Sequence, residues 1–326
     1  MQLSAAFARH VPPARLLLAG IALLLLPRST WGWGCRGHQI VALIADKQLT
    51  AEARAGVESL IGDPGTVTDI PRSCSTTGLP PIAHVSTWAD DVRNARPDTG
   101  AWHFLDIPRG ATAGPATRFC PTGGCVVSAI EAQRRILANE RVGARGRAEA
   151  LMYVIHFIGD IHQPLHAATN RDRGGNCVPV DFFGRAARPD RHAGHGVWHP
   201  NLHQVWDTDL LERAMGTTRI ATYAARLDAR FASRVAEWQH GTAAEWAWET
   251  HAVADDVAYG RLPQPLPTEP GDVGRCDERG TASHWRRFHV RLGSTYQSAA
   301  AAAIDTQLAR AGARLAMILN QAFSTR

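Results

Sequence analysis

One apolar segment constrains this fold more than any other part of the chain. From Arg147 to His162 the sequence reads RAEALMYVIHFIGDIH, and its apolar residues surround the helix axis on every side. This pattern predicts a helix buried at the centre of a domain. His156 and Asp160 are four residues apart, so they share one face of that helix. A carboxylate in apolar surroundings is costly unless it is paired or binds a metal.

A second His/Asp pair repeats this spacing further along the chain. His203 and Asp207 lie four residues apart in NLHQVWD, and His166 ends the segment HFIGDIHQPLH that begins at His156. Either pair alone is explained by an ion pair between residues i and i+4, or by a buried histidine whose hydrogen bonds are made within the core. Both pairs together with His166 indicate zinc, which binds imidazole and carboxylate ligands.

Three further segments carry ligand-type residues beside tryptophans. Asp90 lies in STWADDVR, His103 in AWHFLDIP, and Trp33 begins the stretch WGCRGH that ends at His38. The alternative for Asp90 is a helix N-cap, and for His103 a packed core residue.

The N-terminus has the layout of a secretory signal peptide. Arg9 and Arg15 precede an apolar run from Leu16 to Leu26, and small residues follow it. The run is too short to span a bilayer, which takes about 20 residues, although an uncleaved anchor is the alternative. We expect a signal peptide over residues 1–32 and one mature domain over residues 33–326, secreted or periplasmic and not stably bound to a membrane. Removing residues 1–32 lowers the formal net charge from +5 to +2. The net charge of the full chain is therefore weak evidence for nucleic-acid binding.

Six cysteines remain in the mature chain, and an even number in an exported protein indicates disulfides. Cys120 and Cys125 flank PTGG, a turn sequence, and we expect them to be joined. The spacing does not determine the other pairs, for which we favour Cys35 with Cys74 and Cys177 with Cys276.

Helical periodicity dominates the chain, and the pattern predicts one mainly α-helical domain with long loops. Ser128 is expected as the N-cap of its helix, with Glu131 completing a capping box. The expected helices cover residues 40–49, 128–141, 147–162, 202–215, 217–238, 243–259 and 299–323. The expected loops cover residues 62–82, 108–127, 170–200 and 262–284. A domain boundary near residues 263–283 is possible, but we favour a last helix that packs back on the rest.

The order of these motifs resembles a known family. WGxxGH, WAD, WHFxD, HFxGDxHQPLH, GGN and NLHxxWD follow one another from Trp33 to Asp207, as in the zinc-dependent single-strand-specific nucleases and 3′-nucleotidases of fungi, plants and bacteria. The resemblance implies a bacterial secreted member with a mainly α-helical, phospholipase C/nuclease-like fold and a cleft that holds three zinc ions.

The resemblance also implies which residues bind metal, and it leaves His162 outside the ligand set. His192, His195 and His199 are expected in a variable, solvated loop. The implied ligands are Asp90, His103, His156 and Asp160 for one zinc; Asp160, His38 and the α-amine and carbonyl of Trp33 for a second; and His166, His203 and Asp207 for the third.

The implied reaction is hydrolysis of single-stranded DNA, RNA and 3′-nucleotides to 5′-phosphorylated or dephosphorylated products by a monomer. A zinc-bridged hydroxide would attack phosphorus in line, so Asp90 and Asp160 count as catalytic through the metals they hold. Arg93 would steady the charge on the transition state. Phe104 and Asp106 would form a nucleobase pocket, with Asn176 as a further substrate contact. For Arg93 the alternative is a surface residue, and for Phe104 a core residue.

Two other functions remain open at this stage. A zinc-dependent phospholipase C shares the fold, the N-terminal tryptophan and the number of metals, but it would release a lipid headgroup. A non-catalytic zinc-binding module would hold its metals with no open coordination position.

Overall fold

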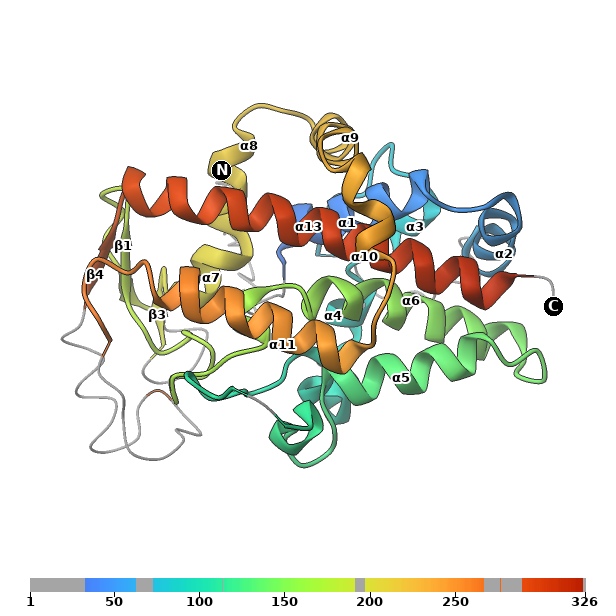
Figure 1. Cartoon of the computed structure of the whole chain (residues 1–326), viewed down its shortest axis with the longest axis horizontal. Coiled ribbons are helices and arrows are strands. Elements are labelled where there is room, and N and C mark those ends of the chain that lie inside the picture. The colour runs from blue at the N-terminus through green and yellow to red at the C-terminus, as the bar shows by residue number, and fades with distance from the viewer. Residues whose placement is uncertain are drawn as a thin grey trace, which may run out of the picture.

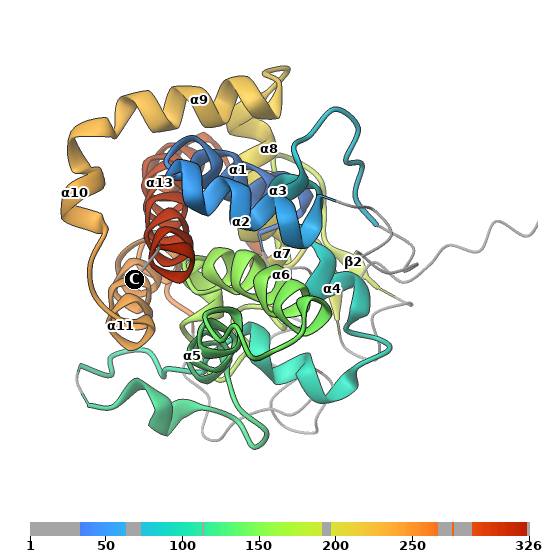
Figure 2. The ribbon, with the colours of Figure 1, turned by 90° about the vertical axis from the view of Figure 1, so that its right-hand side faces the viewer.

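The helix α6 (Ala144–Asp160) lies at the centre of the molecule, as the sequence predicts. The computed structural model describes residues 33–62, 73–112, 114–190, 197–266, 276 and 289–324. From Ala150 to Asn170 every residue is buried. In the end-on view, α1 (Cys35–Lys47) and α2 (Ala51–Ile61) lie on one side of α6 and α5 (Val126–Leu137) on the other (Figure 2). The expected signal peptide lies outside the described residues.

The long helix α13 (Ser294–Phe323) crosses the whole molecule (Figure 1). It packs against α1, α2, α6 and α8 (Leu210–Met215), so the C-terminal segment belongs to the same domain as the rest. The helix begins five residues before the predicted start at Ala299. The described chain therefore forms one mainly helical domain, and the possible boundary near residues 263–283 does not divide it.

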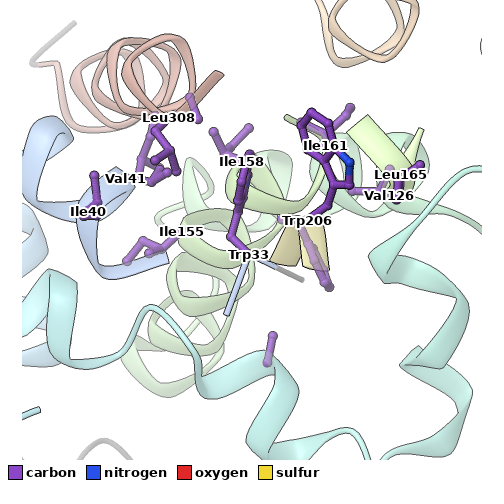
Figure 3. Packing of buried hydrophobic residues seen from close by; sticks show 14 of the residues in the cluster. Trp33, Ile40, Val41, Val126, Ile155, Ile158, Ile161, Leu165, Trp206 and Leu308 are labelled. Carbon is purple, nitrogen blue, oxygen red and sulfur yellow. The ribbon is translucent and has the colours of Figure 1, made fainter. Parts of the chain in front are cut away.

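The hydrophobic core joins α6 to the helices on either side of it. Ile155 and Ile158 of α6 lie close to Val41 of α1, with Leu308 of α13 and Trp33 beside them (Figure 3). All five side chains are at most 1 % exposed. Burial of aliphatic side chains stabilises such a core by roughly 1.5–3 kcal/mol each, which holds the C-terminal end of α6 in a fixed place.

The other elements are short, and several carry site residues at their ends. The helical ones are α3 (Pro81–His84), α4 (Trp88–Val92), η1 (Pro97–His103), η2 (Ala116–Phe119), η3 (Pro164–His166), α7 (Leu202–Gln204), η4 (Val205–Asp209), α9 (Ile220–Arg230), η5 (Ala232–Arg234), α10 (Val235–Trp238), α11 (Ala243–Val253) and η6 (Ala254–Tyr259). Two small sheets pair β1 (Val180–Phe182) in parallel with β4 (Val290–Leu292), and β2 (Arg188–Pro189) antiparallel with β3 (Trp198–His199).

Several predicted boundaries are wrong. Ser128 is not an N-cap: Cys125 caps α5, and Ser128 sits at the third helical position, where its Oγ accepts from Cys125 N at 2.9 Å. The helix predicted over residues 217–238 breaks into α9, η5 and α10 around Phe231. The predicted helices over 202–215 and 243–259 contain the π-helical turns η4 and η6. The helices α2, α3 and α4 were not predicted.

Three disulfides tie loops to this helical frame. Cys35 is joined to Cys74, Cys120 to Cys125, and Cys177 to Cys276. No described helix combines the length and hydrophobicity needed to cross a bilayer. His192 and His195 lie outside the described residues, and His199 lies in β3.

Candidate metal centre

Seven elements bring the predicted ligands together at the C-terminal end of α6. His156 and Asp160 end that helix, and each of the other residues sits at or near the end of a short element. Asp90 lies in α4, His103 ends η1, His166 ends η3, His203 lies in α7, Asp207 in η4, and His38 in α1. All of these side chains are at least nine-tenths buried.

The first group contains Asp90, His103 and His156. His156 Nε2 lies 3.2 Å from His103 Nδ1, and Asp90 reaches both rings at 3.5 Å. Asp160 Oδ2 lies 3.0 Å from His103 and 3.2 Å from His156. Donor atoms about 2.0 Å from a tetrahedral zinc lie about 3.3 Å apart, so these separations suit one shared ion.

The second group contains His38, His156 and Asp160. His38 Nε2 lies 3.4 Å from Asp160 Oδ1, and the His38 ring stacks on His156 with ring centroids 4.0 Å apart. The opposite oxygen of Asp160 faces the first group, so this carboxylate can bridge two ions. Trp33 is fully buried and lies against Gly37, the residue before His38. The next residue, Gly34, donates its N–H to the backbone O of Asp207, a residue of the third group, at 2.8 Å.

The third group contains His166, His203 and Asp207. The Nε2 atoms of His166 and His203 lie 3.2 Å apart, and Asp207 Oδ2 lies 3.4 Å from His203 Nε2. The π-helical turn η4 carries Asp207, and such widened turns are frequent at functional sites. Gln163 donates its amide N–H to Asp207 Oδ1 and so orients this carboxylate.

Hydrogen bonds to backbone carbonyls fix the histidine tautomers. His166 Nδ1 lies 2.7 Å from His103 O, and His203 Nδ1 lies 2.7 Å from Gly174 O. His156 Nδ1 lies 2.9 Å from Ser86 O. Each Nδ1 donates to its carbonyl. Burial lowers the pKa of His166 and of His203, so in these neutral rings Nε2 carries a lone pair that points into the site, whereas His156 must lose its Nε2 proton to bind a metal.

The lone pairs that face one another in the site require bound cations between them. Two acceptors 3.2 Å apart, as in His166 and His203, repel each other unless a cation lies between them. Buried atoms of His38, Asp160 and Asp207 also lack a hydrogen-bond partner within the described chain. The donor set of imidazole and carboxylate is the one that zinc prefers. The three groups therefore fit three metal ions.

Burial keeps most of these imidazoles neutral. It lowers the pKa of His38 and of His103 to about 4, and the pKa of His203 to about 3. Burial also opposes charge on His156, but the Asp160 and Asp90 carboxylates outweigh it and raise the pKa of His156 to about 9. Neutral imidazole is the form that binds metal, so three of these ligands need no deprotonation near neutral pH.

A cleft of about 190 Å³ opens over the third group. The histidines His103, His166 and His203 line it together with Arg93, Phe104, Asp106 and Asn176. Phe104 is partly exposed and belongs to no described hydrophobic cluster, so it is not a core residue. Arg93 donates from Nη2 to Gly100 O at 3.1 Å, which holds its guanidinium at the cleft.

The structure adds Arg173 to the cleft, which the sequence analysis did not single out. Arg173 directly precedes the Gly-Gly-Asn of the GGN motif, so its position next to this motif was the available signal. His162 lies away from the three groups: its Nδ1 donates to Ile158 O at 2.8 Å, and its Nε2 accepts from Arg314 at 3.0 Å.

The helical domain and the three ligand groups are those of a protein with a multinuclear metal site. The family model for S1/P1 nuclease matches residues 33–324, and the chain belongs to this family. It is therefore a nuclease, a hydrolase of phosphodiester bonds.

Curated relatives come from fungi and plants. Nuclease S1 of Aspergillus oryzae is 32 % identical over 240 residues, covering 70 % of this chain and 74 % of the relative. Nuclease P1 of Penicillium citrinum is 27 % identical over 316 residues, covering 89 % and 97 %. Endonuclease 2 of Arabidopsis thaliana is 26 % identical over 324 residues, covering 94 % and 96 %.

Proposed function

We propose that this nuclease binds three zinc ions and hydrolyses single-stranded DNA and RNA, with a 3′-nucleotidase activity at the same site. The observation that carries the proposal is the cleft itself. Ligand-type residues of two of the three His/Asp groups (His103, His166 and His203) line it, together with the partly exposed Phe104 and the Asp106 carboxylate. Bound zinc would activate water near neutral pH and offset charge on the phosphate.

The three groups support the following ligands for each proposed ion. Asp90, His103, His156 and Asp160 would hold the first, and His166, His203 and Asp207 the third. Asp160 would bridge to the second, which His38 and the amine and carbonyl of Trp33 complete. The burial of Trp33 and the bond from Gly34 to Asp207 support this assignment, because both keep the start of the mature chain beside the site.

Side chains around the cleft would bind and orient the substrate. A base stacked on Phe104 could donate from its edge to Asp106, and stacking requires an unpaired base. Asn176 donates one N–H of Nδ2 to Arg173 O at 2.8 Å, which leaves its Oδ1 and its second amide hydrogen for contact with substrate. Arg93 would hold an oxygen of the phosphate through planar, fixed donors. Cleavage of the bond between the 3′-oxygen and phosphorus would leave 5′-phosphorylated products.

Residues 1–32 are proposed as a signal peptide that is removed before Trp33. The mature protein would then be a monomeric, secreted or periplasmic bacterial enzyme. The three disulfides support export, since such bonds persist in oxidising compartments.

A substrate panel tests the proposal against a phospholipase C. The purified enzyme is expected to release acid-soluble nucleotides from single-stranded DNA and RNA faster than from duplex DNA. It is also expected to release phosphate from 3′-nucleotides and no phosphocholine from lipid vesicles. Faster release of phosphocholine than of nucleotides would reject the proposal.

A further inference from the structure

The cleft contains a second guanidinium that the proposed function does not use. Arg173 lines the cleft together with Arg93, His166 and His203, and its side chain is exposed. It makes no ion pair with a carboxylate of the described residues. An arginine that faces a cleft without an acidic partner is free to bind an anion.

A buried carboxylate builds the loop that carries Arg173. Asp172 is fully buried, and its Oδ1 accepts from Asn170 N at 3.1 Å and from Gly175 N at 2.9 Å. Tyr259 donates its hydroxyl to the same oxygen at 3.0 Å. These bonds close the loop on both sides of Arg173, so its backbone position is fixed before any substrate arrives.

The backbone of Arg173 is one that most residues avoid. Its φ is +58°, and the next two residues, Gly174 and Gly175, have φ values of +59° and +84°. A glycine would adopt this left-handed conformation at no steric cost, whereas arginine adopts it against its preference. Strained positions of this kind cluster at functional sites. Arg171 in the same loop has a similar φ of +61°, so it is the position of Arg173 at the cleft that distinguishes its side chain.

The loop also touches a proposed metal ligand. Gly174 O accepts from His203 Nδ1 at 2.7 Å, and a Cβ added at Gly174 would lie 3.3 Å from that nitrogen. Arg173 is thus one residue from a carbonyl that orients the third group. The Arg173 side chain lines the same cleft as His166 and His203, where a phosphate would bind to the third group.

We propose that Arg173 is a second phosphate-binding residue, and that it favours the terminal phosphate of a 3′-nucleotide over an internal phosphodiester. This inference rests on the proposed function. A phosphomonoester dianion carries twice the charge of a diester, so an added guanidinium attracts it more strongly. It also offers three free oxygens rather than two, which lets two arginines and the metal groups bind it together.

The test compares Arg173→Gln and Arg173→Lys with the wild-type holoenzyme. The matched control is Arg171→Gln, because Arg171 lies in the same loop with a φ of +61° and does not line the cleft. We expect R173Q to lower kcat/KM for a 3′-nucleotide about tenfold, mainly through KM, since a bond between charged groups has roughly this effect. For a single-stranded oligonucleotide the loss is expected to be about threefold. R173K should recover part of the difference, and R171Q should change neither value more than about twofold.

Two further measurements separate substrate binding from support of the metal site. Titration calorimetry with inorganic phosphate should give a Kd about tenfold weaker for R173Q than for wild type, with unchanged metal content. The salt dependence of kcat/KM for the oligonucleotide should lose about 0.7 from its logarithmic slope, the share of one phosphate contact on a single strand. Equal losses for both substrates, an unchanged Kd for phosphate, or loss of metal from R173Q would each overturn the inference. A wild-type enzyme that hydrolyses neither substrate would instead reject the proposed function.

Discussion

At the scale of single residues, the second metal group depends on a glycine, Gly159, as well as on its ligands. Gly159 lies on α6 between His156 and Asp160, where the His38 ring passes over the helix. A Cβ at this position would lie 2.6 Å from His38 Nδ1 and 2.9 Å from its Cε1. Real Cβ atoms do not approach ring atoms so closely, so only glycine allows His38 to reach Asp160.

Gly159→Ala should therefore displace His38 and release one metal ion of three. Alanine is the better helix former by up to about 1 kcal/mol, so the helix itself should not unfold. Metal analysis and turnover would be measured against Gly146→Ala in the same helix, where an added Cβ meets only a methyl of Val142. A G159A enzyme with a full metal complement and normal turnover would refute this account of the close approach.

The proposed nucleobase pocket rests on Phe104. Replacing Phe104 with Ala should weaken use of single-stranded substrate by about 1–3 kcal/mol, the usual value of one base stack. Metal content should stay the same, because Phe104 lines the wall of the cleft and is not a ligand. Phe119→Ala is a suitable control, since Phe119 packs against the core rather than lining the cleft. Loss of metal from F104A would make Phe104 structural and remove the pocket.

The sequence predicted much of the site at this scale and missed one residue. Histidine and carboxylate in apolar surroundings stand out because their burial is costly without a partner. The structure brings the predicted side chains of Asp90, His103, His156 and Asp160 into contact. Arg173 gave no such signal, because an arginine in a glycine-rich loop usually lies in solvent.

At the scale of elements, the start of α1 brings the proposed chain terminus to the metals. Gly37 allows the turn, since a Cβ there would lie 2.5 Å from Trp33 Cβ. A free terminal amine and its own carbonyl can chelate one metal, whereas the nitrogen of an internal residue is a planar, non-basic amide. The proposed cleavage before Trp33 would therefore complete the second metal group.

One extra residue before Trp33 tests this role. If the terminal amine is a ligand, the extended protein should lose one zinc and most of its rate, while the remaining two groups keep their ions. The comparison is the mature protein that begins at Trp33, prepared in the same way. Three zinc ions and normal turnover in the extended protein would show that Trp33 only packs beside the site.

The elements also show where sequence patterns stop being informative. The helix α6 was predicted because apolar residues lie on every side of its axis. The π-helical turn that carries Asp207 was not, because a helix with one widened turn keeps the same apolar pattern. The cap of α5 was misplaced by three residues, since Ser128 bonds backward to Cys125 instead of capping the helix itself. Short elements such as α4 depend on tertiary contacts rather than on local periodicity.

At the scale of the whole molecule, α13 secures the end of α6 that carries the metals. Arg314 of α13 is 2 % exposed and donates to His162 Nε2 at 3.0 Å, and Gln307 donates to His162 O at 2.9 Å. Arg314 also pairs with Glu249 of α11 at 2.6 Å. His162 therefore makes fold contacts within the segment HFIGDIHQPLH and belongs to none of the three ligand groups. The last helix, far away in sequence, completes the scaffold of the site.

The proposal that three zinc ions carry the nuclease activity is tested most directly by metal content measured alongside hydrolysis. The purified mature protein should contain close to three zinc ions per chain and cut single-stranded DNA faster than duplex DNA. Exhaustive chelation should abolish cleavage of both single-stranded and duplex DNA. Adding zinc should restore cleavage in proportion to the amount of zinc that binds again. Full activity in protein verified to contain no metal would contradict the account.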